Sequence, residues 1–470
     1  MPDSPLTVTR RQFSLSSLGG LGLSAPLEAE GGWDKMPWAG PAKVKKVYVA
    51  VPRPTWPRPT IPVEQTRAEI DAKLSELERK HPNVVRFSGG ELVRTMDEAN
   101  AWVKNLAGED VDGNLVITIT SGSDGMVEAI GKSAIPTLLF LRPYAGHAWA
   151  TFSAFAQAGN KADVLASSDY DDLDVYMRIF STIHQMRKSK VIVVVPGSSR
   201  NKLADGFSEH FGTAFSYMSY ADLRAAYDAV DALQASQEAE KFTHGALRIV
   251  EPTRDKIERA LRFYLGVKNL LRQAQANAIT IDCLGGINRG DLPGYPCAAW
   301  SRLNDQGLYG VCQADLQCTM TQLLLTSFSG KPGFVFNPVF DTSRSEILHT
   351  HCVAPTAMRG IGAPASPYIL RSHLETHDGV SLQVLLPIGE TMTVAKFDHP
   401  RRFMVSTAEV IGNVESESGC RTQIRTRVKN AGKMLANFKG GVHRVSFYGD
   451  YTGPIEKMGR LMGFEVVHEM

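Results

Sequence analysis

The residues Val44-Lys45-Lys46-Val47-Tyr48-Val49-Ala50-Val51 predict the first β-strand of the fold. They follow a linker rich in proline, glycine and tryptophan over residues 31–41, so we expect the folded structure to begin here. Further along, short apolar runs alternate with amphipathic stretches such as residues 65–79. The apolar runs are residues 84–87, 115–120, 137–141 and 191–195. This alternation predicts an α/β fold with a parallel sheet covered by helices on both faces.

The pattern changes twice after residue 195. Residues 220–241 and 253–276 predict long helices, 278–283 predict a buried strand, and 314–327 predict a helix. Beyond residue 330, short alternating runs punctuated by Gly, Pro and Asp are typical of an antiparallel sheet or barrel. The predicted organisation is a signal and linker over 1–43, two Rossmann-like lobes with parallel sheets over 44–189 and 190–330, and a C-terminal, β-barrel-like domain over 331–470.

Composition narrows the function classes. Lysine plus arginine total 51 and the acids total 49, and this net charge of +2 gives no electrostatic case for nucleic acid or an anionic membrane. A small neutral substrate fits this balance. The 6 cysteines form no CxxC or CxxH pair, which favours buried free thiols over a zinc site or a disulfide scaffold.

The N-terminus resembles a twin-arginine export signal. The motif is Thr9-Arg10-Arg11-Gln12-Phe13-Ser14-Leu15, followed by a mildly apolar stretch over residues 16–26. That stretch is too short and too rich in glycine and serine to span a bilayer. We therefore expect an exported protein, periplasmic or extracellular, without a membrane span.

The most informative segments lie after residue 290. They are Gly290-Asp291-Leu292-Pro293-Gly294-Tyr295-Pro296-Cys297, Val311-Cys312-Gln313-Ala314-Asp315-Leu316, Ser329-Gly330-Lys331-Pro332-Gly333-Phe334-Val335-Phe336-Asn337, His351-Cys352 and Gly441-Val442-His443-Arg444. In their order and character the chain resembles the L-fucose/L-arabinose isomerase superfamily. The likeness covers most of residues 44–470 in organisation and is specific from about residue 290 onward.

The resemblance implies a sugar site with a divalent cation, usually manganese, and carboxylates that move a proton between C1 and C2 of an open-chain sugar. That family holds the metal with a glutamate, an aspartate and a histidine. Carried onto this sequence, the positions are Gln313, Asn337 and His443. An amide supplies no charge and accepts no proton, and losing a general base costs about 10²–10⁴-fold in rate. We therefore expect a weakened or absent metal and altered isomerase chemistry.

Two acids lie near the altered positions. Asp315 is two residues from Gln313, which is about 200° round a helix, so it cannot replace Gln313 without a shift. Asp341 is four residues along a strand from Asn337 and on the same face, so it reaches the site if the strand bulges.

Other polar residues are candidate substrate contacts. Asp282 ends a buried strand, a common place for such contacts in open α/β sheets. Tyr295 and Trp300 either stack on a sugar face or pack in the core, and His351 is either a ligand or a satisfied core histidine. A further cluster, in one strand and turn, either contacts the sugar or forms a solvated strand end. Its members are Arg371, His373 and Glu375, with His377 and Asp378 beside them.

Three functions remain open at this stage. The first is a carbohydrate-processing, isomerase-like enzyme with a modified mechanism that uses Asp341, Glu375 or Asp315 in place of the missing acids. The second is an exported sugar-binding protein without catalysis, and the third is a glycoside-acting hydrolase or lyase with a carboxylate pair. All three place a small sugar between the second lobe and the C-terminal domain. The resemblance also implies a homo-oligomer, a trimer or a hexamer.

Overall fold

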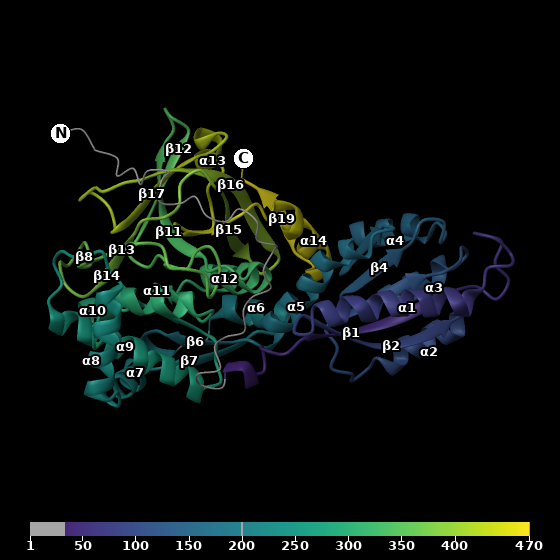
Figure 1. The fold of residues 1–470 in the computed structure, drawn as a ribbon, viewed down its shortest axis with the longest axis horizontal. Helices are drawn as coiled ribbons and strands as arrows, with labels where there is room; N and C mark the ends of the chain where they lie inside the picture. The colour runs from purple at the N-terminus through teal and green to yellow at the C-terminus, as the bar shows by residue number, and fades with distance from the viewer. Residues whose placement is uncertain (1–32, 199–200, 470) are drawn as a thin grey trace. The chain divides into compact units, whose positions relative to one another are not determined.

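The fold is seen in a computed structural model that describes residues 33–198 and 201–469. The predicted export signal lies outside the described residues. The predicted fold class is confirmed: the chain is α/β, with parallel sheets and a closed antiparallel barrel in its C-terminal region (Figure 1). The chain packs as two units. The smaller is Trp38–Arg187 with Gly453–Val466, and the larger holds Lys188–Thr452 with the described ends of the chain.

The smaller unit is built on a parallel sheet with the strand order β2-β1-β3-β4-β5. The strands are β1 (Ala42–Val49), β2 (Val85–Val93), β3 (Gly113–Thr118), β4 (Thr137–Leu141) and β5 (Ala162–Ala166). All residues of β3 and β4 are buried, as expected for parallel strands that are covered on both faces. The helices are α1 (Val63–Lys80), α2 (Met96–Asn105), α3 (Asp124–Gly131), α4 (Ala148–Gln157), α5 (Asp174–Lys188) and α14 (Thr452–Met462).

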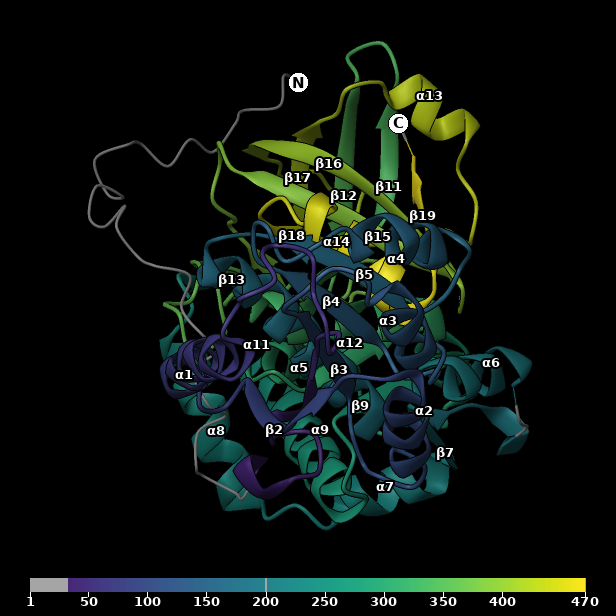
Figure 2. The ribbon, with the colours of Figure 1, turned by 90° about the vertical axis from the view of Figure 1, so that its right-hand side faces the viewer.

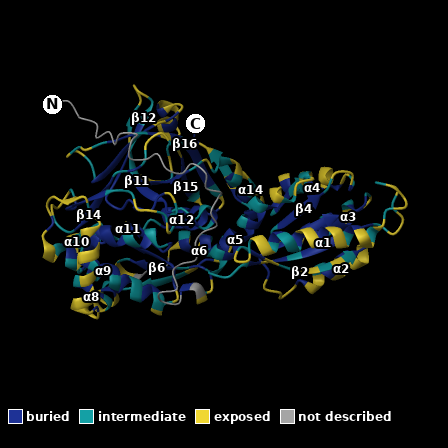
Figure 3. Cartoon of the chain, in the orientation of Figure 1, coloured by how far each residue is buried: buried dark blue, intermediate teal, exposed yellow. Residues whose placement is uncertain are grey.

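Helix α1 shows how the sequence pattern produces this covering layer. Its buried residues are Thr66, Ile70, Leu74 and Leu77, whose spacing of three and four places them on one helix face. Most of the remaining positions carry charged side chains. Figure 3 shows exposed residues along the outer surface of α1 and α2, while strand β4 of the same sheet is buried.

The larger unit begins with a second parallel sheet in the order β10-β9-β6-β7. Its strands are β6 (Lys190–Val194), β7 (Ala214–Met218), β9 (Ala278–Ile281) and β10 (Tyr309–Cys312). Its helices are α6 (Lys202–Phe211), α7 (Tyr220–Asp228), α8 (Ala232–His244), α9 (Arg254–Gln273), α10 (Cys283–Arg289) and α11 (Cys297–Asp305). The chain leaves β6 toward β7 on one side and later reaches β9 on the other. In open parallel sheets, such a reversal marks the place where ligands bind, beyond the carboxyl ends of the strands.

The single helix predicted over residues 220–241 is two helices. Helix α7 ends at Asp228, and the Asp231 carboxylate then accepts a hydrogen bond from the backbone N–H of Gln234 at 2.9 Å, starting α8. An aspartate at this N-cap position stabilises a new helix start, so the break has a local cause.

Residues beyond 330 form the barrel. Its strand order is β15-β18-β11-β12-β17-β16, and pairing of β15 with β16 closes it. The strands are β11 (Phe334–Asp341), β12 (Glu346–His351), β15 (Thr391–His399), β16 (Arg402–Asn413), β17 (Thr422–Arg427) and β18 (Arg444–Tyr448), with β19 (Glu465–His468) added beside β16. A small sheet pairs β8 (Arg248–Ile249), β13 (Tyr368–Arg371) and β14 (Ser381–Val384). The remaining short elements are helix α13 (Ala431–Ala436) and 3-10 turns at Trp33–Lys35, Tyr170–Leu173 and Pro196–Ser198.

Helix α12 (Leu316–Ser329) joins the second sheet to the barrel. It follows β10 and packs against β9, β10, β15 and β18. Figure 1 draws it below β15, and Figure 2 draws it between β15 and β9. Leu323, Leu324 and Leu325 are all fully buried, so this helix is covered on most sides. Its N-terminus is therefore where the carboxyl edge of the parallel sheet meets the barrel.

The predicted free thiols are confirmed. All 6 cysteines are unpaired, and only Cys420 among them is partly exposed. Within the described residues, no helix combines the length and the apolar character needed to cross a bilayer.

Candidate functional site

Four adjacent strands of the barrel carry polar residues at one level, beside the start of α12. These residues are Lys396 on β15, His443 just before β18, Asn337 on β11 and His351 at the end of β12. The level follows from the register, in which Ala395 pairs with Val445 and Phe336 pairs with Arg444. Strand pairing therefore places residues that are far apart in the sequence on neighbouring strands, and the side chains that it brings close to one another are those of Lys396, His443 and His351.

Asp315 completes this group from α12. Its Oδ1 accepts the backbone N–H of Cys318 at 2.8 Å, which caps the helix. Its Oδ2 accepts from Lys396 Nζ and from His443 Nδ1, each at 3.0 Å. Burial favours a raised pKa for Asp315, but the His443 hydrogen bond, the Lys396 charge and the Cys318 N–H outweigh it and hold the pKa well below its ordinary value. Asp315 is thus an anion under all ordinary conditions.

The charge of Asp315 determines which nitrogen of His443 carries hydrogen. An ionised carboxylate only accepts hydrogen bonds, so Nδ1 of His443 must be the donor. In the neutral ring, Nε2 then keeps its lone pair. An aspartate that orients a histidine in this way leaves the second nitrogen free to act as a general base.

His351 lies beside His443, with the ring centroids 5.5 Å apart. Burial, followed by the charges of His443 and His373, lowers the pKa of His351 to about 3, so its ring is neutral. Its Nδ1 accepts the backbone N–H of Cys352 at 2.9 Å, and hence Nε2 carries the hydrogen. This Nε2 atom is buried and has no hydrogen-bond partner in the described part of the chain. A buried donor without an acceptor is costly, and a ligand atom would satisfy it.

The turn from β10 into α12 is strained. Gln313 and Ala314 have φ angles of 60° and 51°, in the left-handed region that non-glycine residues rarely adopt. The backbone N–H of Ala314 donates to Ile281 O at 2.9 Å and helps to hold this conformation. Each such residue costs on the order of 1–3 kcal/mol, and strain of this kind is concentrated at functional sites. Gln313 is exposed here, and Asn337 is half-buried.

A crevice of about 470 Å³ lies beside this turn. Its wall includes Ala314 and Leu316, which flank Asp315 in the chain, and Val195 at the carboxyl end of β6. It therefore occupies the edge of the sheet where the strand order predicts ligand binding.

A divalent cation does not fit this group well. Asp315, Cys318 and His443 do bring three possible ligand atoms within 4.8 Å of one another. However, the Lys396 ammonium already occupies the carboxylate oxygen that such an ion would use. At about 4 Å, repulsion between this ammonium and a divalent ion amounts to about 8 kcal/mol at an effective dielectric constant near 20. The amides Gln313 and Asn337 bring no compensating charge.

Two other residues predicted from the sequence, Asp282 and Trp300, lie outside this group. Asp282 caps α10 by accepting from Gly285 N at 3.2 Å, and its carboxylate also contacts Tyr220 and Arg289. Trp300 has no exposed surface and packs against Phe263, so it belongs to the core. These contacts give both side chains a structural role.

Asp341 is not brought to the site either. The pairing of β11 with β12 is regular from Asn337 to Asp341, without the bulge that was needed to bring the carboxylate near. Asp341 instead lies at the exposed hairpin turn, where it accepts from Ser343 N at 3.1 Å and Ser343 Oγ at 2.6 Å. These hydrogen bonds are typical of an aspartate that stabilises a turn.

A second group surrounds a smaller cavity of about 220 Å³. Tyr295 and Asp378 line this cavity, and the ring of His373 lies 5.5 Å from that of Tyr295. Glu375, which follows His373 by two residues in the sequence, is exposed. Arg371 is buried and donates to Glu251 at 2.8 Å and to Glu417 at 2.9 Å, so this guanidinium holds strands and loops together.

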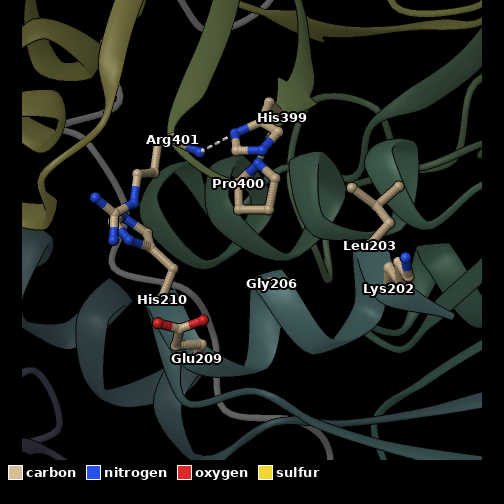
Figure 4. A pocket seen from close by; sticks show the side chains of 8 residues that line it. All are labelled: Lys202, Leu203, Gly206, Glu209, His210, His399, Pro400 and Arg401. Atoms are coloured by element: carbon tan, nitrogen blue, oxygen red, sulfur yellow. Dashed lines mark hydrogen bonds between the residues drawn. The ribbon is translucent and has the colours of Figure 1, made fainter. Parts of the chain in front are cut away.

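Figure 4 shows another pocket, of about 400 Å³, between α6 and the turn that joins β15 to β16. Lys202, His210, His399 and Arg401 contribute basic side chains, and Glu209 contributes an acid. None of the site residues predicted from the sequence lines it. Lys202 also lines the crevice beside Asp315, so the two hollows are neighbours.

No protein-family model matches the sequence, and no curated protein matches it. The site is therefore characterised by its geometry alone. Lys396 and Cys318 were not anticipated from the sequence. The available signal for Lys396 was a lysine inside the apolar run Thr393-Val394-Ala395-Lys396-Phe397, where a buried strand otherwise carries no charge.

Proposed function

We propose that this protein is a carbohydrate-processing enzyme of the aldose–ketose isomerase type with a modified mechanism. Its sugar site is the group formed by Asp315, His443 and Lys396 at the junction of the second parallel sheet and the barrel. The observation that carries the proposal is the pair of 3.0 Å contacts by which Asp315 Oδ2 binds both His443 and Lys396. This arrangement provides an oriented base next to a fixed cation.

The proposed chemistry moves two protons. His443 Nε2 removes the proton from C2 of an open-chain aldose, and the C–H electron pair forms the C1–C2 double bond while the aldehyde oxygen O1 gains charge. The hydroxyl proton of O2 then passes to O1, the O2–H electron pair forms the C2=O bond, and the double-bond electrons take the first proton back from His443 at C1, which yields the ketose. Asp315 keeps the required tautomer and stabilises the imidazolium that forms. Gln313 and Asn337 donate and accept hydrogen bonds at sugar hydroxyls without taking protons.

The test is an aldose-to-ketose assay on L-fucose, D-arabinose and L-arabinose, followed by ¹³C NMR of the products. We expect ketose from at least one sugar, with a loss of about 10²-fold or more in His443→Asn. His244→Asn changes an exposed histidine on α8 and serves as the matched control. Equal rates in both variants would remove His443 from the mechanism.

A second candidate is sugar binding without turnover. It is favoured by the two amides at Gln313 and Asn337, which suit hydroxyl recognition but not proton transfer. Calorimetric binding of a sugar together with the absence of any ketose would select it. The glycoside hydrolase alternative is less well supported, because a carboxyl group whose pKa is held low, as in Asp315, is a poor general acid.

The proposal also covers the cellular location of the protein and its oligomeric state. The Arg10-Arg11 motif is the basis for proposing export to the periplasm or beyond, and the family resemblance is the basis for proposing a trimer or hexamer. Cell fractionation and light scattering test these two points separately.

A further inference from the structure

Lys396 is an unusual cation for the interior of a barrel. Its side chain is 1% exposed, and Asp315 supplies its hydrogen-bond acceptor at 3.0 Å. An ammonium has three N–H donors, and no other acceptor for them is found among the described residues. Burying a charged group with unused donors is unfavourable, which points to a ligand that completes the shell.

His351, on the other side of His443 from Lys396, also has a buried hydrogen-bond donor that needs an acceptor. Its Nε2–H is buried and has no acceptor in the part of the chain that the structure describes. The two residues lie on β15 and β12, which are separated by β18 and β11, and His443 immediately precedes β18. The group thus presents two unsatisfied donors around one oriented base.

Donors of this kind select an oxygen acceptor and reject a metal ion. The hydrogen on His351 Nε2 occupies the position of the lone pair that would bind a cation, and the ammonium of Lys396 repels one. A carbonyl oxygen, by contrast, accepts two hydrogen bonds. Its acquired charge during enediol formation would strengthen both.

We propose that Lys396 is the resident cation of this site: together with His351 it receives the carbonyl oxygen of the ligand, and the protein binds no divalent metal there. The identity of the ligand as an open-chain sugar rests on the proposed function. The exclusion of metal rests only on the contacts of Lys396, Asp315 and His351.

The ammonium is close to the surface on one side. A Cβ added to Gly441, an exposed residue with φ of +83°, would stand 3.5 Å from Lys396 Nζ. The glycine backbone leaves space beside the ammonium that any side chain would fill. This turn, residues 440–441, is the side from which a small ligand can approach Lys396.

Cobalt titration of the purified full-length protein tests the proposal without any assay of activity. Visible absorption reports tetrahedral Co²⁺, and a near-ultraviolet band reports a Cys318 thiolate bound to it. We expect no stoichiometric Co²⁺ or Mn²⁺ at this site in the original chain. Lys396→Met should raise Co²⁺ affinity at least tenfold, because it frees Asp315, Cys318 and His443 as ligands.

Two further variants complete the design. Lys396→Arg keeps the charge and should remain free of metal, whereas Asp315→Asn added to Lys396→Met should abolish the gain. The proposal would be overturned if the original chain bound one equivalent of Mn²⁺ or Co²⁺ and the double variant Cys318→Ser, His443→Asn lost it. This result does not depend on whether Lys396→Met folds. Absence of sugar turnover with the expected metal result would remove the proposed function and leave Lys396 as the resident cation.

Discussion

Lys396 and Asp315 form a buried ion pair between the barrel and the start of α12, with Nζ 3.0 Å from Oδ2 and side-chain exposures of 1% and 12%. The same carboxylate oxygen orients His443. One aspartate therefore links the capping of α12, the charge of Lys396 and the tautomer of His443.

Lys396→Met should lower the free energy of unfolding by about 3–5 kcal/mol, because it leaves a buried carboxylate without its cation. Adding Asp315→Asn should recover part of this loss. Lys43→Met breaks the surface ion pair between Lys43 and Asp110, whose side chains are 54% and 47% exposed. This change should lower the free energy of unfolding by less than about 1 kcal/mol. Urea unfolding of the four proteins measures these differences. Equal losses for Lys396→Met and Lys43→Met would contradict the burial argument.

Asp315→Asn should reduce sugar turnover by about 10²–10⁴-fold, since an amide no longer fixes the Nδ1–H tautomer of His443. Asp341→Asn provides the comparison, because Asp341 lies at the hairpin turn and should leave turnover unchanged. Steady-state rates of the two variants with the same sugar separate these roles. A large loss in Asp341→Asn would mean that the strand moves to bring this acid to the site.

Much of the fold follows from local pattern. The run Thr137–Leu141 was predicted to the residue because it is continuously apolar and bounded by Pro136 and Pro143. Strands β5, β7 and β10 were missed, since runs such as Ala214–Met218 are short and mix polar with apolar residues. Short strands of this kind are stabilised by their neighbours in the sheet, which local pattern does not reveal.

The site was only partly predictable for a related reason. The motifs indicated His443 and the neighbourhood of Gln313 and Asn337, which are local features of the chain. The contribution of Lys396 depends on β15 lying next to β18, a pairing between segments about 50 residues apart. The capping role of Asp315 likewise depends on α12 starting at Leu316, two residues later than predicted.

Stability should decline as the solution becomes acidic, in part because of His349. Burial lowers the pKa of His349 from 6.5 to about 3. A folded-state pKa below the unfolded value gives stability that is present above pH 6.5 and is lost as the pH falls toward 3. The loss from this group is about 2 kcal/mol at pH 5.

Urea unfolding of the original chain and His349→Leu between pH 7 and pH 5 checks this origin. The variant is expected to be less stable at pH 7, because it loses the contact of His349 Nε2 with Thr426 Oγ1 at 3.1 Å and the stacking on Phe336. Its stability should nevertheless depend less steeply on pH. Parallel curves for the two proteins would exclude His349 as the group that titrates.

Trp300→Ala should cost about 3–5 kcal/mol in the free energy of unfolding, because it opens a cavity in a fully buried position. Sugar affinity measured by calorimetry on the folded variant should not change, since the fully buried indole packs against Phe263. A loss of affinity with little loss of stability would instead assign Trp300 to the sugar.

The central claim is that His443 moves a proton of a sugar at a site whose cation is Lys396. Its most direct test is deuterium incorporation from D₂O into L-fucose, D-arabinose or L-arabinose, followed by proton NMR with EDTA present and again with added Mn²⁺. The account predicts enzyme-dependent exchange of the C2 proton in at least one sugar, undiminished by EDTA and lost in His443→Asn. Exchange only with Mn²⁺, or equal exchange in His443→Asn, would contradict it.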